Sequence, residues 1–439
     1  ATINEPSDAP QKSGYFFKYW ALSADLTKEY DWQTPVTGDV TLVAVWGQIT
    51  TPDGLKFTLI NNGAGYEVSD GSAKIDGVIE LPSAYNGKPV IKIASNGFLN
   101  CSKLSGIIIP SSVTAIGKDA FKGTAIWDDS NDVVYADKWV VGYKLSIGDL
   151  VLKSDTIGIS DYAFYGKGIV GINLPSSLKY IGANAFENCN KLTEVIFADN
   201  GVLETIESYA FARTALTSVS IPETVKTIGS DAFYDCDKLT EVNFADNGVL
   251  ETIGSYAFAH TELTSISIPE TVKAIGNYAF YNCDGLTEVI FADNGVLETI
   301  ESYAFARTAL TSVNIPETVK TIGNRAFDSC KNLTNITVEP ENTVYKSDGN
   351  CLIRITDNVL LKGCKNSVIP NYITIIGEGA FSNISNLTSI TIPYGVEEIG
   401  DYAFSYCSSL TSVILPSSVT AIGKDAFYYC SNLSEIELP

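Results

Sequence analysis

The sequence contains no methionine and only one histidine, His260, in 439 residues. It has no apolar stretch approaching the ~20 residues of a membrane-spanning helix, and no N-terminal signal pattern. We therefore expect no membrane insertion within this segment. Since the chain starts at Ala1 without a methionine, we interpret it as a mature form or a fragment, with any export signal or wall anchor outside it.

Positive charge is also scarce, because 29 Lys and Arg face 51 Asp and Glu, for a formal net charge of −22. This charge repels nucleic acid and anionic lipid, so we expect neither as a partner. The simplest interpretation is that it keeps a long, repetitive, β-rich surface soluble. The absence of a second histidine leaves Ser–His or Cys–His catalysis to His260 alone.

Repetition dominates what the chain does contain. Ile-Gly followed by Ala-Phe, or a near equivalent, recurs thirteen times, with the phenylalanine at Phe98, Phe121, Phe164, Phe186, Phe211, Phe233, Phe258, Phe280, Phe305, Phe327, Phe381, Phe404 and Phe427. From Phe186 to Phe327 the spacing alternates between 22 and 25 residues, so pairs of units repeat every 47 residues. The chain is too long for one ordinary core, and this period predicts a stacked repeat array.

A typical unit, residues 216–236, begins with a predicted strand. Val219 and Ile221 alternate with Ser218 and Ser220, which is the pattern of a strand with one buried face. One unit cannot bury this face alone, so we expect neighbouring copies to stack as parallel strands ~4.8 Å apart.

The rest of the unit predicts a coil that returns to the core. Pro222 lacks a backbone donor and ends the strand, and Gly229 permits a tight corner. Phe233 is the large core residue, and Ala232 before it leaves room for that ring.

The segment from about residue 54 to 439 resembles the BspA-like leucine-rich repeats of bacterial and protist surface proteins. The resemblance rests on a recurring set of residues, for example Ile392-Pro393, Val396, Ile399-Gly400, Ala403-Phe404 and Cys407. It implies a β-rich solenoid, a leucine-rich-repeat right-handed superhelix of about thirteen coils. Studied members of this group are surface adhesins.

Residues 14–47 do not fit the repeat. Gly14, Trp20, Pro35-Val36-Thr37 and the closing run 42–46 are similar to the latter part of the Listeria–Bacteroides repeat, a small β-rich module of bacterial surface proteins. We therefore divide the chain into a partial β module of this type (1–47), an N-terminal cap with the first coil (48–98), and the solenoid (99–439). Two or three strands are expected in the cap segment, which would cover the exposed apolar end of the stack.

Two insertions interrupt the array, near residues 128–153 and 340–366. Each carries turn residues between short apolar runs, which predicts an inserted β-hairpin. Trp127 and Trp139 of the first insertion could form an exposed aromatic binding patch, although covering apolar solenoid surface is the preferred interpretation.

The longer units carry an Asp-Asn-Gly turn, with Asp199, Asp246 and Asp293 in register. A structural turn is the preferred interpretation, because Asn and Gly accept positive φ. A calcium-binding edge is conceivable, but the spacing matches neither an EF-hand nor a glycine-aspartate calcium roll. We predict no metal site and no cofactor.

Seven of the nine cysteines share one repeat position, three residues after the phenylalanine, namely Cys101, Cys189, Cys236, Cys283, Cys330, Cys407 and Cys430. The four from Cys189 to Cys330 recur two coils apart, about 10 Å, which is too far for a disulfide, so we interpret them as buried small apolar residues. Cys407 with Cys430, and Cys351 with Cys364, could each pair.

The sequence predicts no enzyme. His260 takes a position that arginine fills in sister units, which marks an outer, tolerant position, and Glu435 with Glu437 would lie on a flat strand face with nothing to exclude water. Outward strand positions are instead the natural binding face of such an array. They are Ser218, Ser220, Glu241, Asn243, Ser265, Ser267, Glu288, Ile290, Ser312 and Asn314.

By resemblance to the BspA-like group we expect a non-enzymatic bacterial cell-surface protein, located outside the cell. It would attach as an adhesin to host or microbial proteins or glycans, weakly per unit and with gain from repetition. The alternative is a passive spacer that presents another domain of a larger surface protein. We expect the chain to be a monomer.

Overall fold

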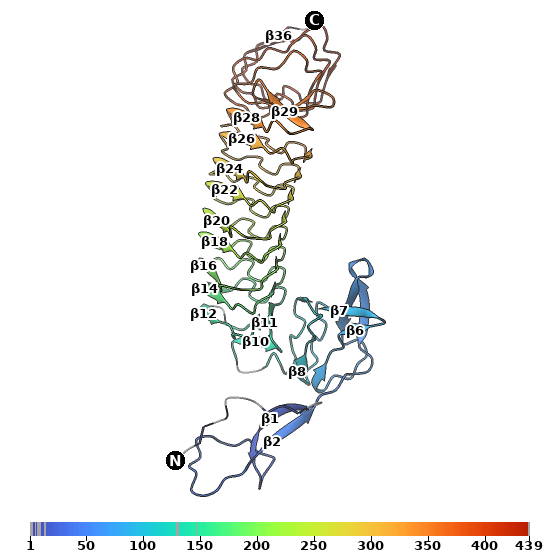
Figure 1. The fold of residues 1–439 in the computed structure, drawn as a ribbon, viewed down its shortest axis with the longest axis vertical. Helices are drawn as coiled ribbons and strands as arrows, with labels where there is room; N and C mark the ends of the chain where they lie inside the picture. The colour runs from blue at the N-terminus through green and yellow to red at the C-terminus, as the bar shows by residue number, and fades with distance from the viewer. Residues whose placement is uncertain are drawn as a thin grey trace. The chain divides into compact units, whose positions relative to one another are not determined.

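The computed structural model describes residues 3–4, 6, 10–12, 15–128, 131–145 and 147–437. Over these residues the chain is a β-solenoid of about 16 turns with almost no helix (Figure 1). A 3-10 turn, η1 (Asn61–Gly63), is the helical element of the described part. The predicted solenoid fold is confirmed. The chain divides into two compact units, unit 1 (1–144 with 159–161) and unit 2 (145–158 with 162–439).

Unit 1 begins with a two-stranded sheet. Strands β1 (Tyr15–Leu22) and β2 (Leu42–Gln48) pair antiparallel, and the ring of Phe17 lies 5.5 Å from that of Trp20 and 6.1 Å from that of Trp46. These aromatic contacts give the small sheet its apolar side. Gly14 of the module motif lies outside the described residues.

The cap segment holds more strands than the two or three that the sequence suggested. They are β3 (Lys56–Ile60), β4 (Gly65–Ser69), β5 (Gly77–Glu80), β6 (Ala84–Tyr85) and β7 (Lys88–Ile93). β4 pairs parallel with β7, and β7 with β9 (Ala115–Ile116), while β5 pairs parallel with β8 (Leu104–Ile108). Strands as short as β6 carry no periodicity that a sequence pattern could show.

The first insertion forms the predicted hairpin. Strands β10 (Val133–Ala136) and β11 (Trp139–Tyr143) pair antiparallel. Trp139 is 1% exposed, and the Trp127 ring lies so close to Gly142 that an added Cβ there would be 2.3 Å from it. The alternative of an exposed aromatic patch is therefore wrong, since the tryptophans pack against the protein itself.

Coils of unit 2 combine a front strand with a two-residue back strand. The front strands are β12 (Ile147–Val151), β14 (Gly168–Leu174), β16 (Glu194–Phe197), β18 (Ser218–Ile221), β20 (Glu241–Phe244), β22 (Ser265–Ile268), β24 (Glu288–Phe291), β26 (Ser312–Ile315), β28 (Asn335–Val338), β34 (Ser412–Ile414) and β36 (Glu435–Glu437). The back strands are β15 (Tyr180–Ile181), β17 (Thr205–Ile206), β19 (Thr227–Ile228), β21 (Thr252–Ile253), β23 (Ala274–Ile275), β25 (Thr299–Ile300), β27 (Thr321–Ile322), β32 (Ile375–Ile376), β33 (Glu398–Ile399) and β35 (Ala421–Ile422). The chain passes between the units more than once, and one of these boundaries falls within β13 (Gly158–Ile159).

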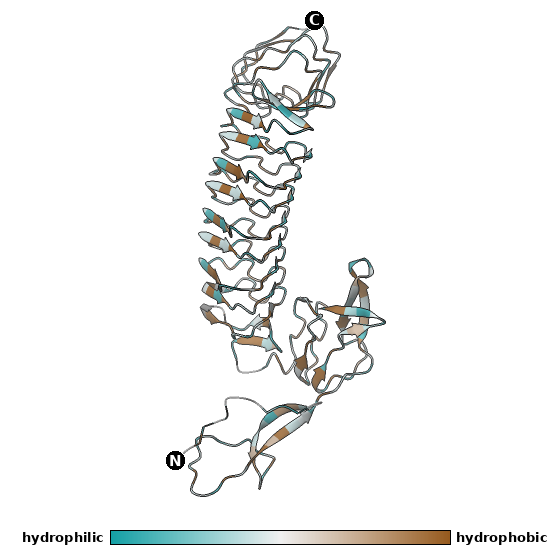
Figure 2. Ribbon diagram, viewed as in Figure 1, coloured by the Kyte–Doolittle hydropathy of each residue, from teal (hydrophilic) through white to brown (hydrophobic). Residues whose placement is uncertain are grey.

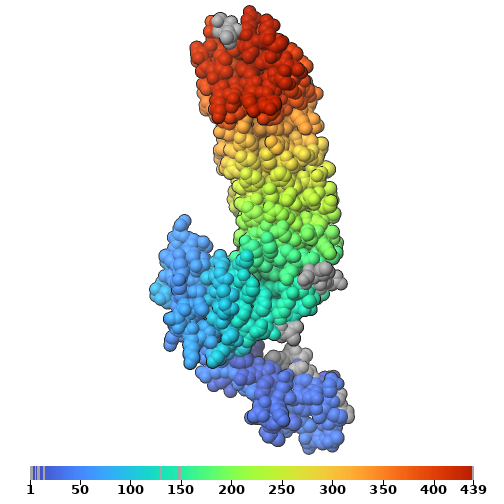
Figure 3. All heavy atoms as spheres, turned by 180° about the vertical axis from the view of Figure 1, so that it is seen from behind, coloured from blue at the N-terminus to red at the C-terminus, as the bar shows by residue number. Residues whose placement is uncertain are grey.

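A column of phenylalanine rings runs through the core of unit 2. From Phe164 to Phe327, neighbouring ring centroids lie 5.0–5.6 Å apart and the rings are within 9° of parallel. The backbone joins the same coils, as where Phe233 N–H donates to the Ala257 carbonyl at 2.8 Å. Each coil is therefore held by its sequence neighbours, and the colour changes in order along unit 2 (Figure 3).

The glycine of the Ile-Gly motif allows close packing of coils rather than a tight corner. Asp231 and Asp235, both with φ of 57°, are the left-handed residues of this coil, and Gly229 is not. A Cβ on Gly229 would lie 2.7 Å from the Glu207 carbonyl carbon and the Ser208 nitrogen. The role predicted for Gly229 was wrong, because the constraint is the backbone of the preceding coil.

The second insertion is a three-stranded meander rather than a single hairpin. Strands β29 (Tyr345–Asp348), β30 (Cys351–Arg354) and β31 (Val359–Lys362) pair antiparallel, and β31 then pairs parallel with back strand β32. Gly363, just after β31, lies against the Phe381 ring. The insertion therefore extends the stack, and such segments add turns to the thirteen counted from the phenylalanine motif.

Candidate binding surface

The ten candidate residues all lie exposed on five front strands of unit 2, from β18 to β26. Their inward neighbours, such as Val219 and Ile266, are 2% exposed. The resulting bands of polar and apolar residues are visible along the strand arrows in Figure 2. We name this surface, formed by the outward residues of β18, β20, β22, β24 and β26, the strand face.

The front strands pair in twos, which the sequence did not predict. β18 pairs parallel with β20, β22 with β24 and β26 with β28, and within the described residues 147–437 no ladder joins β20 to β22 or β24 to β26. The back strands from β15 to β27 form an unbroken parallel series. One pair of coils, with its 47-residue period, is thus the structural unit of the strand face, and we call it a doublet.

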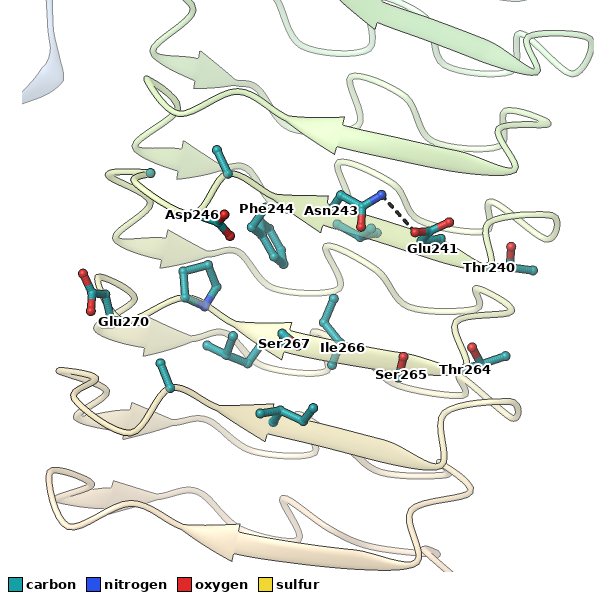
Figure 4. A pocket seen from close by; sticks show the side chains of 17 residues that line it. Thr240, Glu241, Asn243, Phe244, Asp246, Thr264, Ser265, Ile266, Ser267 and Glu270 are labelled. Atoms are coloured by element: carbon teal, nitrogen blue, oxygen red, sulfur yellow. Dashed lines mark hydrogen bonds between the residues drawn. The ribbon is translucent and has the colours of Figure 1, made fainter.

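Each junction between doublets opens into a groove. Between β20 and β22 the groove has a volume of about 720 Å³ and is lined by outward residues of both strands and by the turn after β20 (Figure 4). Ile290 of the next strand, 47% exposed, forms part of its wall. A second groove of about 470 Å³ lies between β24 and β26. We name them the first and second doublet grooves.

Both grooves are acidic. Glu241, Asp246 and Glu270 line the first, and Asn243 Nδ2 donates to Glu241 Oε1 at 3.0 Å (Figure 4). Asp293, Glu317 and Glu339 line the second. Neither set of lining residues, all within the described part of unit 2, contains Lys or Arg.

Two lysines of the doublets, Lys273 and Lys320, pair with carboxylates outside the grooves. Lys273 Nζ lies 2.9 Å from Glu251, and Lys320 Nζ lies 2.6 Å from Glu298, both pairs beside the back strands. Among the described residues, the groove carboxylates make no ion pair within 4.0 Å. Their negative charge is therefore available to a partner.

The Asp-Asn-Gly segments form backbone turns. Gly248 N–H donates to Ala245 at 3.0 Å, and Gly295 N–H donates to Ala292 at 2.9 Å. The three aspartates recur two coils, about 10 Å, apart, so they cannot share one ion. The described residues contain no group of three or more His, Cys, Asp or Glu side chains placed to hold a metal ion. The geometry favours the turn interpretation.

A second surface feature, absent from the sequence predictions, is an alternating column of cationic and aromatic side chains. Arg213 lies 5.5 Å over the Tyr234 ring, and Arg307 lies 5.5 Å over the Tyr281 ring. His260 lies between the two tyrosines, with ring centroids 5.4 and 5.7 Å away. Arginine and histidine exchange at this position because each presents a flat face or edge to tyrosine. The contacts are structural, which agrees with the interpretation of His260.

Seven of the nine cysteines are buried, Cys101 and Cys430 are partly buried, and all nine are free thiols in the structure. Cys236 donates to the Phe211 carbonyl at 3.2 Å, and its sulfur lies 3.3 Å from the Thr214 hydroxyl. The same Thr–Cys contact between successive coils recurs at 3.2 Å one and two 47-residue periods further along the chain. Burial raises the pKa of Cys236 to about 11.

We expect a pH effect that depends on this thiol. Because its pKa is about 11 when folded and near 9 when unfolded, its contribution to stability is intact below pH 9 and is lost as the pH rises through 11. At pH 10 the loss should be about 1 kcal/mol. Urea unfolding at pH 8 and pH 10 checks this, with Cys236→Thr as the control, since threonine fills the slot in sister coils. An equal pH response of both proteins would contradict the prediction.

Two family models match the chain. The model of the BspA type leucine rich repeat region matches residues 79–129, 157–251, 251–359 and 354–439, in six copies. The chain belongs to the BspA-type leucine-rich repeat family. The Listeria-Bacteroides repeat domain matches residues 1–45, which confirms the resemblance of the N-terminal module. BspA-type repeats are typical of bacterial surface proteins.

Solved structures of bacterial leucine-rich repeat proteins resemble this BspA-type chain in fold. A Bacteroides ovatus protein is 24% identical, with a TM-score of 0.46 over 88% of this chain and 93% of that one. A leucine rich cell surface protein from Faecalibacterium prausnitzii is 23% identical, with a TM-score of 0.43 over the same shares. A Eubacterium ventriosum protein is 24% identical, with a TM-score of 0.42 over 56% of this chain and 60% of that one. No curated protein matches the chain.

The solenoid fold of leucine-rich repeats is typically non-enzymatic. Glu435 and Glu437 lie exposed on β36, on the open strand surface expected from the sequence. No helix of the described residues is long and apolar enough to cross a membrane.

Proposed function

We propose that this BspA-type chain is a non-enzymatic protein of the bacterial cell surface that attaches to host or microbial surface proteins or glycans through its strand face. The observation that carries the proposal is the repetition of one exposed surface. Residues 201–219 and 295–313 are identical in sequence, and the outward residues of β18 and β26 lie on equivalent strands.

The chemistry of the strand face supports weak contacts that add up. Its outward residues are mainly Ser, Asn and Glu, without the Trp and Arg side chains that dominate compact high-affinity interfaces. Several weak contacts to one extended partner raise the overall affinity, because each further contact forms at high effective concentration. The family, typical of bacterial surface proteins, supports the location outside the cell.

A binding experiment with the 439-residue chain tests this proposal. It would be applied to immobilised extracellular-matrix proteins, mucins and glycans at two salt concentrations. Deleting residues 217–263 removes one 47-residue doublet and joins Leu216 to Thr264, which holds the position equivalent to Thr217. We expect saturable binding to one class, weakened about three- to tenfold by the deletion through lost multivalency.

The Glu298→Gln variant, which changes a back-strand surface, serves as the matched control and should bind as the parent does. Absence of binding across the panel would overturn the proposal and favour the passive spacer. Binding that the doublet deletion leaves unchanged would move the site away from the strand face.

A further inference from the structure

The backbone at the first doublet groove has unused hydrogen-bonding groups. In the next doublet, Ala292 N–H donates to the Ile268 carbonyl at 3.3 Å, so the residue after β24 is directed towards β22. β20 pairs with β18 in the same register. Successive residues of a strand direct their N–H and C=O groups to opposite sides, so Glu241 and Asn243 face β18 whereas Val242 and Phe244 face β22. Since no ladder joins β20 to β22 in the described chain, the backbone groups of Val242 and Phe244 are open to water or to a ligand.

The opposite wall of the groove has the same property. Thr287 N–H donates to the Thr264 carbonyl at 3.0 Å, so Thr264 is directed towards β24. The backbone groups of Ser265 and Ser267 are then directed back towards β20. The groove therefore offers donors and acceptors from two strand edges, and its side chains Glu241, Asp246 and Glu270 supply only negative charge. A ligand that complements it is a polar chain with cationic side groups.

The spacing of the grooves sets the period of that ligand. Successive grooves lie two coils apart, about 9.6 Å at the usual distance between strands. A polyproline-II helix has three residues per turn and rises about 9.3 Å per turn, so every third side chain points the same way. In a β-strand, residues three apart point to opposite faces and cannot enter neighbouring grooves.

We propose that the doublet grooves bind a polypeptide segment in the polyproline-II conformation that carries Lys or Arg at every third position. The segment lies along the stack of coils and places one basic side chain in each groove. Glu241, Asp246 and Glu270 receive it in the first groove, and Asp293, Glu317 and Glu339 in the second. This inference rests on the proposed function and gives it a partner of defined chemistry.

Synthetic peptides test the inference directly on the full chain. The probe is a labelled peptide of four Pro-Pro-Lys triplets, compared with one of the same composition whose lysines are adjacent, and with four Pro-Pro-Glu triplets. Fluorescence anisotropy should show the periodic lysine peptide binding severalfold more tightly than the clustered one. Binding should weaken with salt, and the glutamate peptide should not bind.

Neutralising one groove locates the site. The variant Glu241→Gln, Asp246→Asn and Glu270→Gln keeps the size of each side chain and should weaken binding about three- to tenfold. The matched control, Glu251→Gln with Glu298→Gln, removes exposed carboxylates beside the back strands and should have little effect. Circular dichroism and thermal unfolding show whether both variants fold.

Equal binding of the two lysine peptides, or binding unchanged by groove neutralisation, would overturn the inference. Tighter binding of a chitosan oligosaccharide, a cationic glycan, would overturn its assignment to a polypeptide. The two proposals fail separately. If the chain binds the immobilised proteins or glycans and groove neutralisation does not weaken that binding, only the groove inference is wrong. If the lysine peptide binds through the groove but no immobilised protein or glycan binds, only the proposed adhesion is wrong.

Discussion

Replacement of Phe258 by alanine is expected to lower the free energy of unfolding by about 3–5 kcal/mol. Its side chain is 0% exposed, and its ring is stacked at 5.3 Å on Phe233 and at 5.5 Å on Phe280. The loss combines removed apolar contact with a cavity that hydrogen-bonded coils on both sides cannot close. Urea unfolding followed by circular dichroism measures it.

The control for this substitution is Phe427→Ala. Phe427 is half-buried and stacks on a single described neighbour, Phe404, at 5.3 Å. Its replacement by alanine should lower the free energy of unfolding by about half as much, because Phe427 buries less apolar area than Phe258. Equal effects of the two substitutions would mean that the phenylalanine column does not act through stacking between coils.

Replacement of Gly254 by alanine is the second substitution with a large expected effect. A Cβ on Gly254 would lie 2.6 Å from the Gly229 carbonyl carbon and 2.7 Å from the Ser230 nitrogen. These are backbone atoms of the preceding coil, which cannot rotate away as a side chain can. The coils would have to separate at the back ladder, so we expect a loss of about 2–3 kcal/mol, measured by urea unfolding.

Gly171→Ala provides the comparison for this position. Gly171 lies on front strand β14, and an added Cβ would meet only the Glu194 carbonyl oxygen, at 3.9 Å. Its effect should stay within about 0.5 kcal/mol or be slightly stabilising, since alanine restricts the unfolded chain. If Gly254→Ala is equally mild, the close approach of coils is not what the Ile-Gly motif preserves.

The sequence predicted the interior of each coil well because burial alternates with residue type. Val219 and Ile221 are buried and Pro222 follows the strand directly, as expected. The left-handed residues were less accessible to prediction. Asp231 is a familiar choice at positive φ, whereas Tyr256 and His260, with φ of 55° and 60°, take this conformation only because the stack holds them there.

The sequence predicted which residues of the strand face are exposed, but it did not predict the grooves between them. The alternation places Ser265 and Ser267 outside, and the structure agrees. The grooves depend on which neighbouring strands form ladders, and that depends on the path of the whole coil. The three extra residues of the longer units indicate two kinds of coil, yet no sequence rule states that β20 pairs with β18 and not with β22.

The Thr–Cys contact inside the core has a consequence for how such an array can grow or shrink in evolution. Thr214 and Cys236 belong to successive coils, so loss of a single coil would bring two like side chains together. Loss of 47 residues would place Cys283 against Thr214 and so keep a Thr–Cys contact, and gain of 47 residues would keep the same alternation. Recombination between near-identical gene segments would therefore change the reach of the protein in steps of about 10 Å. Each viable step would add or remove one complete groove.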